Sequence, residues 1–237
     1  MKIVEAFSKF AYEYNKHNVI QKEVAKKLTL FLKRSNYAKI LDLGSGDGEV
    51  YKNLRKRNIQ IREFVALDFS TEMLALHPTD VFIKKICLDF NKTASFSIFK
   101  EKEFDVLISS SALQWSKDLK SIFIEISSLS SEYYFSFFTS NTFKTLHKTA
   151  NIISPIYSRE KIIDALDKTF IYESETVHYR LEFNSVHDML RYIKRSGVSG
   201  GVEQLSYRQM KALMINYPLD YLEFEVLFVK VIGCLDK

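Results

Sequence analysis

This 237-residue chain has few cysteines and no long apolar run. Its two cysteines, Cys87 and Cys234, both stand in apolar, strand-like runs. That number excludes a disulfide-built scaffold and supplies no zinc-ligand spacing, so we expect two buried free thiols and no metal. No run approaches the roughly 20 apolar residues that span a membrane. The opening residues Met1-Lys-Ile-Val-Glu-Ala also lack the apolar core of a secretory signal. We therefore expect a cytoplasmic protein that does not bind membranes.

The charge of the chain is only mildly basic, with a formal net charge of +5 and a pI near 8.9. A balance this mild, without a basic and aromatic strip or an appended module, does not indicate a nucleic-acid partner. The 46% hydrophobic content is ample for one core at this length. We expect residues 1–237 to form a single domain.

Glycine is also scarce, which makes its placement informative. Three of the seven glycines, Gly44, Gly46 and Gly48, fall within five residues. They separate a predicted strand over 39–43 from a predicted helix over 49–57, where glycine permits a tight turn and close backbone approach to a ligand. A dinucleotide-binding loop would place the third glycine one residue later. Asp42 beside the turn suits a cationic ligand better than a pyrophosphate, although an ordinary strand-turn-helix joint is the simpler alternative.

Asp68 follows Gly48 by twenty residues, at the end of the apolar run Phe64-Val-Ala-Leu. A carboxylate there can accept hydrogen bonds from both ribose hydroxyls, so the spacing favours a nucleoside-containing cofactor. Asp89 ends the next predicted strand and interacts either with an adenine amino group or with its own turn; the loop favours the former. Small residues at 109–112, after another predicted strand, leave room for the ligand.

This pattern resembles the first motif of class I S-adenosylmethionine-dependent methyltransferases, and the resemblance implies S-adenosyl-L-methionine as cofactor. The candidate cofactor-binding residues are Asp42, Gly44, Ser45, Gly46, Gly48, Asp68, Phe69, Asp89, Phe90, Ser109 and Ser110.

Alternating apolar runs predict an α/β fold. We expect a Rossmann-like seven-stranded sheet, mostly parallel, with strands over 39–43, 62–67, 81–87, 104–109, 132–139, 170–183 and 221–233. Two helices within 4–34 would form an N-terminal cap over residues 1–35. Helical segments over 141–169 and 185–216 would form a lid inserted after the fifth strand, with the glycine-rich stretch that starts at Gly197 as its hinge.

Several residues are candidates for the acceptor side. Gln114 and Trp115 follow the small residues 109–112, although a lone Trp is more often core. Tyr14 and Gln21 share a helical face, which packing alone would also explain. The basic cluster on the predicted helix over 186–196 could hold an anionic substrate or an acidic carrier, or could simply be solvated. It comprises Arg191, Lys194 and Arg195.

The whole chain then resembles one family, the malonyl-acyl-carrier-protein O-methyltransferases of biotin synthesis (BioC). The resemblance is carried by the start from Phe7 to Gln21, by Ser111-Ala-Leu-Gln-Trp, by Phe137-Phe-Thr-Ser-Asn-Thr-Phe-Lys-Thr-Leu-His, by Ser185-Val-His-Asp-Met-Leu-Arg-Tyr-Ile-Lys-Arg-Ser-Gly and by Tyr217-Pro-Leu-Asp-Tyr.

It implies methyl transfer to the free carboxylate of a malonyl thioester, carried by acyl carrier protein or coenzyme A. Our hypothesis is that Tyr14 and Gln114 donate hydrogen bonds near the reacting centre. Gln21, Trp115 and the basic cluster would bind substrate or carrier, with Arg191 or Lys194 pairing with the carboxylate. Two alternatives stay open: another small-molecule carboxyl or hydroxyl O-methyltransferase, and a non-catalytic cofactor-fold binding protein.

Overall fold

The computed structural model describes residues 18–92, 95–195 and 205–235. Its strands are β1 (Asn36–Leu43), β2 (Gln60–Asp68), β3 (Ile83–Cys87), β4 (Phe104–Ser110), β5 (Ser130–Phe138), β6 (Phe170–Glu182) and β7 (Tyr221–Cys234). Its α-helices are α2 (Val19–Thr29), α3 (Glu49–Lys56), α4 (Thr71–Leu76), α5 (Leu119–Ile126), α6 (Lys144–Ala150), α7 (Arg159–Leu166), α8 (Val186–Arg195) and α9 (Tyr207–Asn216). Two short 3₁₀ helices, η1 (Ser95–Ile98) and η2 (Leu113–Trp115), flank β4.

All seven strands form one sheet, in the order β3-β2-β1-β4-β5-β7-β6. The first five strands run parallel, whereas β7 is antiparallel to both of its neighbours. This confirms the predicted mostly parallel α/β sheet. Strand β1 pairs with β2 on one side and β4 on the other, so the order reverses there. In doubly wound sheets, ligands bind beyond the carboxyl ends of the strands at this switch point.

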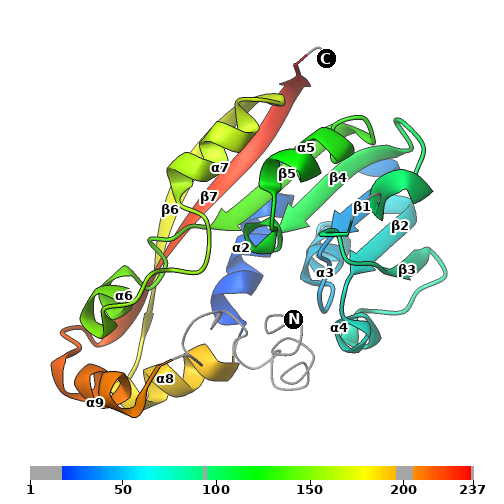
Figure 1. The fold of residues 1–237 in the computed structure, drawn as a ribbon. Helices are drawn as coiled ribbons and strands as arrows, with labels where there is room; N and C mark the ends of the chain where they lie inside the picture. Colours follow the sequence, from blue (N-terminus) through cyan, green and yellow to red (C-terminus); the bar gives the residue numbers. More distant parts are fainter. Residues whose placement is uncertain (1–17, 93–94, 196–204, 236–237) are drawn as a thin grey trace.

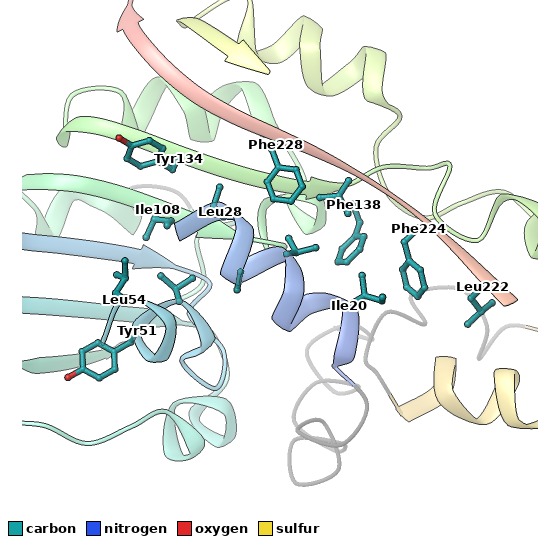
Figure 2. Packing of buried hydrophobic residues seen from close by; sticks show 14 of the residues in the cluster. Ile20, Leu28, Tyr51, Leu54, Ile108, Tyr134, Phe138, Leu222, Phe224 and Phe228 are labelled. Carbon is teal, nitrogen blue, oxygen red and sulfur yellow. The ribbon is translucent and has the colours of Figure 1, made fainter. Parts of the chain in front are cut away.

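Helices cover both faces of the sheet (Figure 1). One core cluster joins α2, α3 and α8 to one face, and a second joins α5 and α7 to the opposite face. Figure 2 shows α2 lying among apolar side chains from α3, β4, β5 and β7, with Ile20 and Leu28 among the labelled residues. Leu28 has no exposed surface, so α2 is held firmly against the sheet.

Helices α6, α8 and α9 follow β5 in the chain. They lie near one end of the long antiparallel pair of strands β6 and β7 (Figure 1). Helix α6 begins at Lys144, inside the segment 141–169 that was predicted to be helical. Thr142 Oγ1 donates to the Glu225 carbonyl (3.1 Å) and Phe143 N to the Glu223 carbonyl (2.8 Å). These bonds hold the entering chain on β7, and Phe143 takes φ 60°, which is not helical. The first of the two predicted N-terminal helices and the glycine-rich stretch from Gly197 lie outside the described residues.

The predicted burial of the two thiols is wrong. Cys87 and Cys234 are both exposed. Cys87 ends β3, which is the edge strand of the sheet, and Cys234 ends β7. An apolar run therefore indicated a strand correctly, but it did not indicate burial at the strand's end.

Candidate functional site

The glycine loop stands at the switch point of the sheet. β1 ends at Leu43, and the next two residues turn back across β2, where Gly44 N and Ser45 N both donate to the Leu67 carbonyl (2.8 and 2.9 Å). All three glycines have positive φ, at 76°, 53° and 84°. Gly44 also allows a close approach, since a Cβ built there would lie 2.2 Å from Ala112 Cβ. Positive φ favours glycine at all three positions, and Gly44 and Gly48 also have no room for a side chain.

Asp42 is a buried carboxyl group at the end of β1. It has no exposed surface, and neither carboxyl oxygen has a hydrogen-bond partner within the described residues. Burial, followed by the nearby charges of Asp68 and Asp47, raises its pKa well above the ordinary value. A buried acid without a partner is costly to keep, and it indicates a site for a cationic group or a strong donor.

Asp68 lies opposite, at the end of β2. Its Oδ2 accepts from Gly46 N and its Oδ1 from Ser70 N, both at 2.9 Å. Burial raises its pKa to about 6, although the backbone hydrogen bonds act in the other direction. Its predicted contact with ribose stays a prediction; the structure adds that this carboxylate also orders the loop through Gly46.

A small cavity of about 50 Å³ opens beside the loop. Its lining includes Gln21 from α2 and the backbone of Gly44 to Gly46. Gln21, predicted for the acceptor side, thus lies next to the predicted cofactor loop. Ser45 lines the same space, and its buried Oγ has no partner among the described residues. Ligand sites usually have about 300–1,000 Å³, so a nucleoside ligand requires these walls to separate.

The remaining cofactor candidates surround the loop. Ser109 Oγ donates to the Leu43 carbonyl (2.7 Å), which ties β4 to β1, and Ser110 lines the small cavity. Asp89 Oδ1 accepts from Asn91 N (2.9 Å), as the turn alternative predicts, so its contact with adenine stays a prediction. Phe90 is buried and Phe69 is half-buried.

A second, larger cavity of about 670 Å³ is lined in part by η2. Gln114 and Trp115 line it, together with α6, the start of α7 and the segment between these helices. Gln114 is 3% exposed; its Nε2 donates to the Ser111 carbonyl (2.7 Å), and its Oε1 is buried without a partner among the described residues. Ser111 lines the small cavity, so this hydrogen bond joins a residue of the larger cavity to a residue of the smaller one. Trp115 is half-buried at the cavity wall instead of in the core.

Arg191, the further acceptor-side candidate whose side chain the structure describes, lines neither cavity. Arg191 is exposed on α8, where its guanidinium bonds Asp188 (3.0 Å) and His187 Nδ1 (3.1 Å). Lys194 and Arg195 continue the same helix, but their side chains lie outside what the structure describes, as does Tyr14.

His77 is a buried residue that the sequence gave no reason to single out. It is 2% exposed, packs near the rings of Tyr51 and Phe64, and bonds the Pro78 carbonyl through Nδ1 (3.1 Å). A Cβ added to Gly48 would lie 2.8 Å from its ring, so His77 supports the loop directly. Burial lowers its pKa to about 4. A loop-supporting role has no sequence signal because it arises from packing alone.

Acidification from pH 6.5 to pH 4 is expected to lower the free energy of unfolding of the wild type more than that of the His77→Asn variant. Histidine in the unfolded chain binds a proton near pH 6.5, whereas folded His77 binds one only near pH 4. The wild type should therefore lose about 2–3 kcal/mol as pH falls from 6.5 to 4, relative to the variant. Urea unfolding of both proteins at several pH values measures this difference. A difference that does not change with pH would show that folded His77 is protonated normally.

Among the residues that the structure describes, no three or more His, Cys, Asp or Glu side chains are grouped to hold a metal ion. Within the same part of the chain, no helix is both long and apolar enough to cross a membrane.

Comparison with known proteins agrees with this geometry. The family described as "Methyltransferase domain" matches residues 41–130. A solved structure of a Haloferax volcanii methyltransferase, in complex with the Trm112 activator, has a TM-score of 0.63 at 16% identity and covers 99% of each chain. The match and the shared fold define the chain as a class I methyltransferase.

Within this class, the chain resembles the malonyl-[acyl-carrier protein] O-methyltransferases. The one from Bacillus anthracis is 27% identical, with 87% of this chain and 83% of the relative aligned. The one from Erwinia billingiae is 26% identical, with 99% of this chain and 96% of the relative aligned.

Proposed function

We propose that the chain transfers a methyl group from S-adenosyl-L-methionine to the free carboxylate of a malonyl thioester on acyl carrier protein, an early step of biotin synthesis. The observation that carries this proposal is the extent of the similarity. It reaches far beyond the methyltransferase match at 41–130 and covers 99% of the chain with the Erwinia relative. It therefore includes η2 and the segments after β5, where acceptor specificity would lie.

The residues around the glycine loop fit this cofactor. When bound, S-adenosyl-L-methionine supplies a methyl group that is activated by attachment to a positively charged sulfur. The buried Asp42 and Ser45 have polar atoms without partners in the part of the chain that the structure describes, and Asp42 provides the negative potential that suits a cation. We assign these two residues and the loop backbone to the methionine end, Asp68 to the ribose, and Phe69, Asp89 and Phe90 to the adenine.

The acceptor needs little chemical help from the protein. A malonyl carboxylate is already ionised at neutral pH, since simple carboxyl pKa values lie near about 4. Catalysis then consists of aligning the carboxylate with the methyl group and excluding water, and alignment alone can supply roughly 7–11 kcal/mol. We assign Gln114 and Trp115 to acceptor positioning, and residues 1–35, 141–169 and 185–216 to a cap and lid within one domain.

Mass spectrometry tests the reaction directly. Malonyl-carrier protein incubated with the enzyme and S-adenosyl-L-methionine should gain one methyl group on the malonyl moiety, and ester hydrolysis should remove it. Butyryl-carrier protein is the matched control, because it has the same thioester but no free carboxylate, and it should stay unmodified. Cofactor binding without methylation of malonyl-carrier protein would reject the acceptor assignment and leave the methyltransferase class intact.

A further inference from the structure

The larger cavity combines features that the proposed reaction does not by itself require. Four residues that line it each contain a buried polar atom without a partner among the described residues: Gln114 Oε1, Ser116 Oγ, His147 Nδ1 and Ser154 Oγ. Gln114 and Ser116 are only 3% and 8% exposed. Buried polar atoms are normally paired, so several orphans around one cavity indicate a polar ligand.

The outer part of the same cavity is basic. Lys117, Lys144 and Lys161 come from three separate segments, line the cavity and are exposed. None of the three forms an ion pair with a described residue, and no Asp or Glu occurs among the described lining residues. A cavity that is lined by several positively charged side chains and by no acidic one attracts an anion.

The wall that carries these groups is fastened in place. Tyr157 Oη donates to the Ser116 and Lys117 carbonyls (2.9 and 3.0 Å), and Ser140 N donates to the Tyr157 carbonyl (2.9 Å). Tyr157 thereby links η2, the end of β5 and the segment before α7. The cavity is thus held open by hydrogen bonds between elements, as expected for a preformed site.

We propose that this cavity holds an extended thioester arm that contains amide groups and a phosphodiester, with the amides beside Gln114 and Ser116 and the phosphodiester at the three lysines. The assignment rests on the proposed function and specifies how its acceptor is bound. The free acceptor atom Gln114 Oε1 matches an amide N–H, whereas it would repel a carboxylate. The lysines match a phosphate as exposed point charges. The arm of a carrier-bound malonyl group, phosphopantetheine, has both of these groups.

Three acceptors of increasing size test the assignment: malonyl-pantetheine, malonyl-4′-phosphopantetheine and malonyl-carrier protein. The test variant combines Lys117→Gln, Lys144→Gln and Lys161→Gln. The matched control is Lys148→Gln, because Lys148 is exposed on α6 one turn after Lys144 and is not among the residues that line the cavity. Each exposed lysine–phosphate contact should raise kcat/KM about two-fold. With three such contacts, the wild type should prefer malonyl-4′-phosphopantetheine over malonyl-pantetheine by about ten-fold in kcat/KM.

The triple variant should lose this preference, and the control should keep it. A preference that survives in the triple variant would overturn the assignment. A loss seen with malonyl-carrier protein but not with malonyl-4′-phosphopantetheine would also overturn it, because the lysines would then bind acidic groups of the carrier surface.

A binding measurement separates this assignment from the reaction itself. Trp115 is the only tryptophan of the chain and lines the cavity, so its fluorescence reports occupancy without methyl transfer. Titration with 4′-phosphopantetheine should change the emission at lower concentration than titration with pantetheine, and the triple variant should abolish the difference. Binding of this kind without methylation of any malonyl acceptor would reject the proposed function and retain the arm site. Equal titration curves in the wild type would reject the site.

Discussion

Replacing Asp42 with asparagine is expected to stabilise the ligand-free protein and to weaken its binding of S-adenosyl-L-methionine by about 100-fold. The carboxyl group is fully buried without a described partner and faces two further acids, so its ionised form is costly. A neutral amide of the same shape removes that cost, and the free energy of unfolding at pH 8 should rise by about 1–3 kcal/mol. The same change removes the negative charge that attracts a cation.

The stability gain from Asp42→Asn should depend on pH. The pKa of Asp42 is raised in the folded state, so its contribution to stability is present at low pH and is lost as pH rises and the group ionises. The gain from Asp42→Asn should therefore be larger at pH 8 than at pH 5. Cofactor affinity in the wild type should change in the opposite direction, increasing with pH as Asp42 and Asp68 ionise, the latter with a pKa of about 6.

Urea unfolding and calorimetric titration measure the two effects. Asp118→Asn is the matched control, because Asp118 is an exposed helix cap and asparagine caps helices equally well. It should change neither quantity. If Asp42→Asn destabilised the ligand-free protein and left cofactor affinity unchanged, Asp42 would be a structural residue and its assignment to the cofactor would be wrong.

Replacing Gly44 with alanine is expected to abolish cofactor binding and to lower the free energy of unfolding by about 3 kcal/mol. The new Cβ would lie 2.2 Å from Ala112 Cβ, and φ is +76°. Such an overlap forces the loop and the segment before η2 apart. Both cavities border this contact, since Ser111 lines one and Gln114 lines the other. Thermal unfolding and cofactor titration measure the loss.

Two further variants separate steric overlap from backbone strain. Gly46→Ala also has positive φ, but its Cβ would meet only the end of Met73 at 3.4 Å, so it should cost about 1 kcal/mol. Adding Ala112→Gly to Gly44→Ala removes the overlapping atom and should recover most of the lost stability. Failure of this second change to recover any stability would show that strain, not overlap, causes the defect.

The sequence predicted which residues gather around the glycine loop better than it predicted which residues line the larger cavity. Asp42, Gly44 and Asp68 lie at the ends of strands, and parallel strands bring their carboxyl ends to one edge, so order along the chain predicts proximity. It could not predict that both oxygens of Asp68 accept backbone hydrogen bonds, because these depend on the path of two turns.

The acceptor side depends on packing that sequence spacing does not encode. Arg191 belongs to a conspicuous helical cluster, yet it is bonded to Asp188 on an exposed surface. Lys117, Lys144 and Lys161 are spread over 45 residues and form no motif; only the folding of α6 and α7 against η2 brings them to one cavity. A tertiary cluster of this kind has no local signal.

The position of β7 bears on how the protein is made. A ribosome synthesises β7 after β1 to β6, yet β7 lies between β5 and β6 and is the sole partner of β6 among the described strands. While it is still inside the exit tunnel, β5 has an open edge and β6 has no partner. Strands β1 to β5 can assemble before β7 emerges, so the open edge of β5 stays exposed during that interval. An exposed strand edge is a template for aggregation. Chaperone demand during translation should therefore peak between the emergence of β5 and that of β7.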